Sequence, residues 1–154
     1  MNILDVLDPK CVRLNAEVEN KFDCLQQCAE CIVASGNYVD EEKLLDGVYA
    51  REHEFSTGIG NGVAIPHYRG DGINKLTVAA LTVPKGVHYR SLDDEPVFVL
   101  FLIAVPKEAN NDHLDVVAKL SKMLMHKEIV DALLKCETVD EFMSTIVEAE
   151  KKFD

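Results

Sequence analysis

The sequence is poor in aromatic residues and in positive charge. It contains no tryptophan, and aromatic side chains make up 6% of its 154 residues, which leaves little surface on which single-stranded nucleic acid could stack. Its 16 lysine and arginine residues stand against 27 aspartate and glutamate residues, a formal net charge of −11. Because that charge repels phosphates, the composition argues against general binding to nucleic acid.

Long apolar runs are also missing. The longest one covers residues 97–105, far below the ~20 residues that a helix needs to cross a bilayer. The first residues, Met-Asn-Ile-Leu-Asp, include no basic segment of the kind that opens a signal peptide, and the five cysteines are an odd number. These features together predict a cytoplasmic protein whose thiols stay reduced.

Three of the cysteines, Cys24, Cys28 and Cys31, follow one another at spacings of four and three residues. One hypothesis is a metal-binding module built from His and Cys side chains. However, this spacing places all three thiols on one face of a helix, whereas a structural zinc site needs a fourth ligand and usually takes its Cys-x-x-Cys pairs from a turn. Since free cysteine is among the most buried residue types, we predict core packing, with no metal and no cofactor.

No Pro/Gly/Ser-rich linker, internal repeat or charge block divides the chain, so we predict one domain over residues 1–154. Apolar residues at helical spacing predict a helix over 15–35 and a second helix that Asp40 caps. The near-continuous apolar runs at 76–83 and 97–105 are typical of strands that are covered on both faces.

Shorter elements are predicted around these. A helical turn and then a strand at 11–13 open the chain, and Pro84-Lys85-Gly86 predicts a turn before a possible edge strand at 87–89. After Pro106, Asp112 is predicted to cap the first of three helices, over 112–125, 127–135 and 139–151. Helices before and after a set of buried strands predict an α/β domain with a mixed central sheet and helices packed on both faces.

The five histidines differ in their surroundings. His53, His88 and His126 lie in polar or edge segments, which predicts surface or half-exposed positions. His67, in contrast, directly follows an expected buried strand at 63–65 and the rigid Pro66. A loop at the carboxyl end of a strand is where open α/β sheets bind ligands, and the nearby glycines allow backbone N–H groups to face an anion. The alternative is a core histidine with its hydrogen bonds satisfied near a turn.

Two further residues are of types and in positions that favour binding of an anion. His113 stands at the expected start of a helix, where partial positive charge and free N–H groups favour phosphate; the alternative is a polar residue in an exposed first turn. Arg51 lies near the end of another helix, and its planar guanidinium can hold a phosphate through two hydrogen bonds. The alternative for Arg51 is a surface ion pair with Glu52 or Glu54.

Residues 52–67, Glu-His-Glu-Phe-Ser-Thr-Gly-Ile-Gly-Asn-Gly-Val-Ala-Ile-Pro-His, resemble the active-site signature of the type-2 IIA components of the bacterial sugar phosphotransferase system (PTS), the fructose–mannitol family. Residues 101–106, Phe-Leu-Ile-Ala-Val-Pro, and 111–114, Asn-Asp-His-Leu, resemble the second half of the same family. The likeness covers about residues 3–148, and it implies that the chain is an EIIA type-2 domain with the mixed sheet described above.

The resemblance also implies a function, that of a phosphotransferase component with a phosphohistidine intermediate. The phosphocarrier protein HPr would place a phosphoryl group on His67, at the ring nitrogen remote from the backbone, while a backbone acceptor holds the other nitrogen. Arg51 and His113 would support the phosphate. The group would then pass to a cysteine of a IIB component during uptake of a sugar of the fructose, mannitol or galactitol type, with the membrane involved only indirectly through the IIC transporter.

One residue departs from the family pattern. The family usually has a small residue directly after the histidine, where this chain has Tyr68. We predict that the Tyr68 ring stands beside the phosphate, where it would narrow the docking surface or donate its hydroxyl. The departure keeps a second hypothesis open, a regulatory EIIA paralogue that is phosphorylated on the same histidine but signals by binding other proteins.

Overall fold

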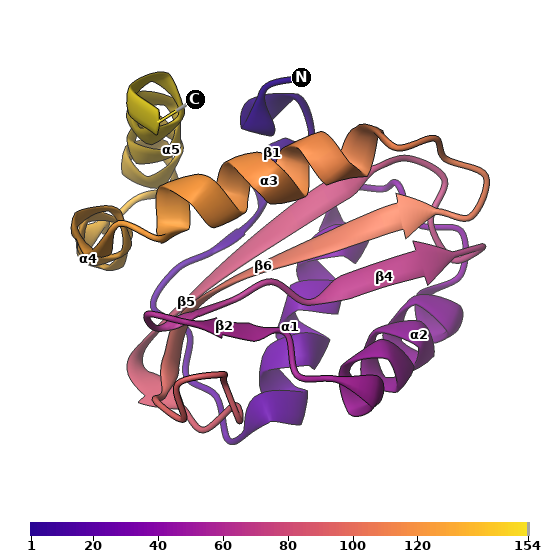
Figure 1. The fold of residues 1–154 in the computed structure, drawn as a ribbon. Coiled ribbons are helices and arrows are strands. Elements are labelled where there is room, and N and C mark those ends of the chain that lie inside the picture. Colours follow the sequence, from indigo (N-terminus) through magenta and orange to yellow (C-terminus); the bar gives the residue numbers. More distant parts are fainter. Residues whose placement is uncertain (154) are drawn as a thin grey trace.

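Within residues 1–153, the part of the chain that the computed structural model describes, six strands form one mixed sheet (Figure 1). Strands β5 and β6 pair antiparallel at its centre, β1 runs parallel to β5, and β3 and β4 run parallel to β6, while β2 pairs antiparallel with β3. The order along the sheet is β1 (Leu7–Arg13), β5 (Thr77–Val87), β6 (Val97–Pro106), β3 (Val63–Ala64) and β2 (Gly58–Gly60), while β4 (His67–Gly70) pairs with β6 next to β3.

Helices cover both faces of this sheet (Figure 1). One face packs on α1 (Lys21–Ala34) and α2 (Glu41–Glu54), and the other on α3 (Asp112–Leu124), α4 (Lys127–Lys135) and α5 (Val139–Phe153). Because both faces are covered, nearly every side chain of β6 is buried, as the apolar run predicted. The predicted fold class is confirmed. Among the described residues, none of the helices has both the length and the apolar character needed to cross a membrane.

Helix α1 is shorter than the predicted 15–35. It begins at Lys21, where the Asn20 side chain accepts a hydrogen bond from the backbone of Asp23. Its buried face carries Cys24, Cys28 and Cys31, so the prediction that these thiols pack in the core is confirmed. Burial raises the pKa of Cys24 to about 12.

Several other predicted boundaries are wrong. Strand β1 begins at Leu7 rather than at residue 11, and residues 87–89 form no separate edge strand. A turn was predicted at Pro84-Lys85-Gly86, but strand β5 continues through these residues to Val87. Its register with β6 shifts between Thr82 and Val87, and such an irregularity accommodates the extra residues within the strand. The residue before α3 is Asn111, so Asp112 does not cap this helix but is its first residue. The Asn110 side chain accepts a hydrogen bond from the Asp112 backbone N–H at 3.1 Å.

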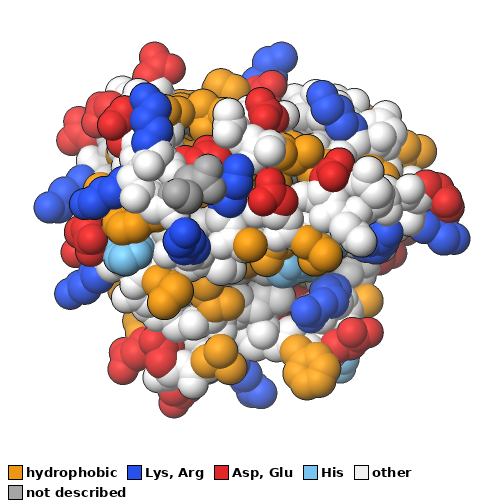
Figure 2. Space-filling view, turned by 45° about the horizontal axis from the view of Figure 1, so that its top comes forward, with side chains coloured by type: hydrophobic (Ala, Val, Ile, Leu, Met, Phe, Trp, Pro, Cys, Tyr) orange, Lys and Arg blue, Asp and Glu red, His pale blue; other side chains and the backbone are white. Residues whose placement is uncertain are grey.

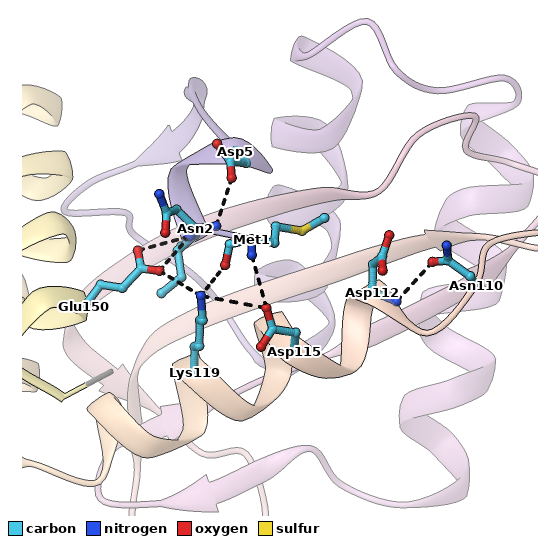
Figure 3. Close-up of polar contacts among 9 residues, drawn as sticks. Met1, Asn2, Asp5, Asn110, Asp112, Asp115, Lys119 and Glu150 are labelled. Atoms are coloured by element: carbon cyan, nitrogen blue, oxygen red, sulfur yellow. Dashed lines mark hydrogen bonds and ion pairs between the residues drawn. The ribbon is translucent and has the colours of Figure 1, made fainter.

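Helix α3 is tied to the beginning of the chain by a cluster of charged groups (Figure 3). The first backbone N–H of the short helix η1 (Ile3–Asp5) lies 3.1 and 3.2 Å from the two carboxylate oxygens of Glu150 on α5. Lys119 of α3 lies 3.4 Å from Glu150 and 3.7 Å from Asp115. These contacts join α3 to both η1 and α5, and so restrain the helix whose first turn carries His113.

Candidate active site

His67 is the first residue of β4 and pairs with Ile103 of β6. The sequence placed it in a loop after a strand, and this prediction is wrong, because β3 and β4 follow each other along the same edge of β6. Pro66 marks the break between them: it has no N–H to donate, but its carbonyl accepts a hydrogen bond from the Ile103 N–H at 2.9 Å. The imidazole therefore stands on a strand whose backbone is paired.

The His67 ring is half-buried, and its two nitrogens differ. Nδ1 is buried without a hydrogen-bond partner of normal geometry among the described residues, so Nε2 is the nitrogen on the exposed side. Burial lowers the pKa of His67, and so do the charges of Arg51 and His113, while the Ile65 backbone and Glu52 act in the opposite direction. Because the net shift is downward, the ring is mainly neutral at pH 7, and a neutral ring can be a nucleophile.

Arg51 lies in the last turn of α2, and its charge is the second cause, after burial, of the lowered pKa of His67. Its Nη1 donates a hydrogen bond to the carbonyl of Phe55, at 3.2 Å, just beyond the helix. The structure of residues 1–153 contains no ion pair of Arg51 with Glu52 or Glu54, so the surface-pair alternative is wrong. The guanidinium stays available on the His67 side of α2.

His113 is the second residue of α3 and is half-buried. Its Nδ1, like that of His67, is buried and lacks a hydrogen-bond partner within the described part of the chain. The charge of His113 is among the causes of the lowered pKa of His67, so the start of α3 lies near the His67 ring. The structure thus brings the three predicted site residues together from α2, β4 and α3.

Glu52 is a buried carboxylate at the centre of a polar network, and sequence reasoning gave it no such role. It is 5% exposed. One oxygen accepts hydrogen bonds from the Thr57 backbone N–H at 2.7 Å and from Lys21 Nζ at 2.9 Å. The other accepts from the Thr57 hydroxyl and from the Tyr89 hydroxyl, the latter at 3.1 Å. Glu52 therefore holds Thr57 in place immediately before the glycine-rich strand β2.

Replacing Glu52 with glutamine should lower the free energy of unfolding by about 2–3 kcal/mol, because it leaves the largely buried Lys21 ammonium without its counter-charge. Chemical denaturation followed by circular dichroism measures this loss. Glu54→Gln on the same helix is the matched control, since Glu54 is exposed and should change stability by less than about 0.5 kcal/mol. Equal denaturation midpoints for the two variants would contradict a structural role for Glu52.

Tyr68 does not lie beside His67, and the prediction that it narrows the docking surface is wrong. Successive side chains of a strand point to opposite faces, so His67 and Tyr68 leave β4 on opposite sides. Tyr68 is 5% exposed, and its hydroxyl accepts a hydrogen bond from the Gly72 N–H at 2.8 Å. Its ring packs against Gly47 of α2.

The remaining histidines are not among the groups that shift the pKa of His67. His53 is exposed, as predicted, and His88, for which half-exposure was predicted, is exposed as well. His126 is partly exposed and stacks on Phe153 with 3.8 Å between ring centroids. A groove of about 780 Å³ opens between the start of α1, the end of α2 and residues 86–90. It is lined by His53 and His88 but not by His67.

The profile of one protein family, described as "Phosphoenolpyruvate-dependent sugar phosphotransferase system, EIIA 2", matches residues 5–149. The chain belongs to this family. Members of the EIIA type-2 family are phosphotransferase components, which is consistent with Arg51 and His113 near the exposed ring nitrogen of His67.

Similar EIIA chains include both transport and regulatory proteins. The fructose-specific EIIA component of Haloferax volcanii is 33% identical, over 89% of this chain and 91% of that protein. The nitrogen regulatory protein of Pseudomonas aeruginosa is 30% identical, over 94% of each. The fructose-specific EIIABC component of Bacillus subtilis is 32% identical, and this chain spans about a quarter (24%) of its length. The crystal structure of IIA-Ntr from Neisseria meningitidis superposes with a TM-score of 0.85 at 27% identity, covering 92% of this chain and 97% of that one.

Proposed function

We propose that this EIIA chain carries a phosphoryl group on His67, which it accepts from phospho-HPr and passes to a cysteine of a IIB component. The observation that carries the proposal is the convergence of Arg51 and His113 on a histidine whose pKa is lowered and whose Nε2 faces outward. Moving a phosphoryl group needs little covalent chemistry beyond an aligned nucleophile, and the rest is positioning and charge stabilisation.

The transfer has two balanced steps. In the first, the Nε2 lone pair of neutral His67 attacks the phosphorus of phosphohistidine on HPr; the new P–N bond forms as the old one breaks, and the HPr imidazole leaves. In the second, a IIB thiolate attacks the same phosphorus, a P–S bond forms, and the neutral His67 ring leaves. Arg51, His113 and the backbone N–H groups of residues 58–62 are suited to hold the oxygens that carry the negative charge.

Apolar side chains around the site support docking by a protein. Phe55, Ile59 and Leu114 are 76%, 39% and 55% exposed, and each lies on a segment that forms the site. Figure 2 shows hydrophobic side chains gathered around a histidine in the middle of one face, with Lys or Arg side chains nearby. Exposed apolar patches with a polar rim mark protein interaction sites.

Mass spectrometry after incubation with phospho-HPr tests the proposal. We expect a single phosphoryl adduct that is acid-labile and base-stable, as a phosphoramidate is, in the peptide that contains His67. Lack of an adduct, or an adduct on another residue, would overturn the proposal.

A regulatory role is the second candidate, and the 30% identity to a nitrogen regulatory protein is the observation that favours it. Both roles use phospho-His67, but only the transport role needs onward transfer. Purified IIB components of the fructose, mannitol and galactitol types would be added to the phosphorylated chain. Rapid loss of the phosphoryl group to one of them supports transport and names the sugar class, whereas retention with all three supports regulation.

His113→Ala should slow phosphorylation by phospho-HPr about 10- to 100-fold, the effect expected when one hydrogen bond to a charged group is lost. The adduct should still form on His67, because His113 is not the nucleophile. Quench-flow measurement of the initial rate checks this. His126→Ala is the control, since that side chain stacks on Phe153 instead. An unchanged rate in His113→Ala would leave His113 without a role in the transfer.

A further inference from the structure

The side chain of Tyr68 occupies a slot made by three glycines. A Cβ atom added to Gly47 of α2 would lie 2.3 Å from Tyr68 Cε1. One added to Gly70 or Gly72, on the chain that follows Tyr68, would lie 2.5 or 2.8 Å from its hydroxyl oxygen. All three distances are below 3.0 Å, closer than a Cβ atom approaches another heavy atom, and none of these glycines has a positive φ. The glycines are therefore explained by the close approach of the tyrosine.

The slot lies where α2 meets β4. The backbones of Val39 and Asp40, at the start of α2, donate hydrogen bonds to the Gly72 carbonyl at 2.7 and 3.2 Å. Gly72 in turn donates to the Tyr68 hydroxyl. The start of α2 is thus held at Gly72, and its middle rests on the Tyr68 ring at Gly47. The helix runs antiparallel to β4, so its last turn lies toward His67.

The spacing of the residues links this contact to the site. Arg51 follows Gly47 by four residues, which places it one turn further along the same face of α2. His67 precedes Tyr68 by one residue, on the other face of β4. Any change in the separation of Gly47 and Tyr68 therefore moves the Arg51 guanidinium relative to the His67 imidazole.

We propose that Tyr68 is a positioning residue, whose ring, seated against Gly47, sets the distance between Arg51 on α2 and His67 on β4. The proposal rests on the proposed function for its effect on phosphoryl transfer. Its structural part concerns the unphosphorylated protein and can be tested without HPr. A misplacement of about 1 Å is enough to slow a positioned reaction about 100-fold.

Gly47→Ala, Tyr68→Ala and the double variant form the central experiment. In Gly47→Ala the new methyl group meets the ring, α2 moves away, and the pKa of His67 should rise because Arg51 no longer lowers it as strongly. Phosphorylation by phospho-HPr should slow about 10- to 100-fold. In Tyr68→Ala the ring that sets the separation is absent, so the pKa of His67 and the rate should change as well. Adding Gly47→Ala to Tyr68→Ala should change neither one further, because the new methyl group no longer meets a ring.

The pKa of His67 would be read from its ring resonances in an NMR titration, with thermal unfolding recorded for every variant. The other groups that act on this ring are Glu52 of α2 and His113 of α3, so the titration is repeated in an Arg51→Gln background. In the Arg51→Gln background, Gly47→Ala should no longer change the pKa of His67. Asp46→Ala is the matched control, because Asp46 is the exposed neighbour of Gly47 and should change neither the pKa nor the rate.

Three outcomes separate the possibilities. Loss of thermal stability in Gly47→Ala with an unchanged His67 pKa would mean that Tyr68 only fills space, and it would overturn the proposal. A pKa change that persists without Arg51 would overturn it too, because the coupling would then not run through that residue. If the wild-type chain is not phosphorylated but the pKa changes follow the pattern above, the positioning is supported and it is the proposed function that fails.

Discussion

Replacing His67 with alanine should abolish the phosphoryl adduct formed with phospho-HPr. The expected loss is complete, because the proposed nucleophile is Nε2 of His67, the ring on which Arg51 and His113 act. The fold should remain, since the half-buried ring makes no hydrogen bond of normal geometry within residues 1–153. Intact-protein mass spectrometry, with circular dichroism to verify folding, measures both results.

His53→Ala is the matched control for this variant. His53 lies on α2 close to Arg51 in the sequence, but its side chain is exposed and lines the groove that does not include His67. This variant should be phosphorylated at the wild-type rate. An adduct that persists in His67→Ala, or disappears in His53→Ala, would show that the phosphoryl group is carried elsewhere.

Arg51→Ala should slow phosphorylation about 100- to 1,000-fold, the effect of removing one preorganised charge-stabilising group. It should also raise the pKa of His67, because the positive charge that disfavours a protonated ring is gone. The sign of the pH effect follows: the reaction needs the neutral ring, so the rate rises as pH increases through the pKa of His67. In Arg51→Ala that rise should be displaced to higher pH.

Initial rates of phosphorylation measured between pH 5 and pH 8 check both parts of this prediction. Arg51→Lys should recover the pKa of His67 more fully than the rate, because lysine keeps the charge but not the planar pair of donors. Arg13→Ala is the control. It removes an exposed arginine of β1 that forms an ion pair with Glu30 of α1. A rate lost in parallel with thermal stability would instead indicate that Arg51 is structural.

The central strands and the later helices could be predicted because their signals are local. The apolar run of β6 and the helical spacing of α4 each appear within a few consecutive residues, and the predicted bounds of α4 agree with the structure. The signature segment likewise made His67 the candidate site residue, because its glycines, Pro66 and the histidine are adjacent in the sequence. Patterns of this kind do not depend on how distant segments meet.

Other features depend on distant contacts and could not be predicted. Lys21 and Tyr89 are far from Glu52 in the sequence, so the burial of that carboxylate had no local signal beyond its place in the signature. Strand β4 is four residues long, and its pairing with β6 decides that Tyr68 faces inward. The sequence alone does not reveal that pairing, so Tyr68 was predicted to lie at the surface, where a tyrosine hydroxyl usually lies.

The burial of every cysteine has a practical consequence. Cys11, Cys24, Cys28, Cys31 and Cys136 are all buried and unpaired, and burial raises the pKa of Cys11 to about 11. Since maleimide dyes react with accessible thiolates, the native chain should resist labelling. A single cysteine engineered at the surface would then take one fluorophore without removal of the native thiols, which makes the encounter with partner proteins observable by fluorescence.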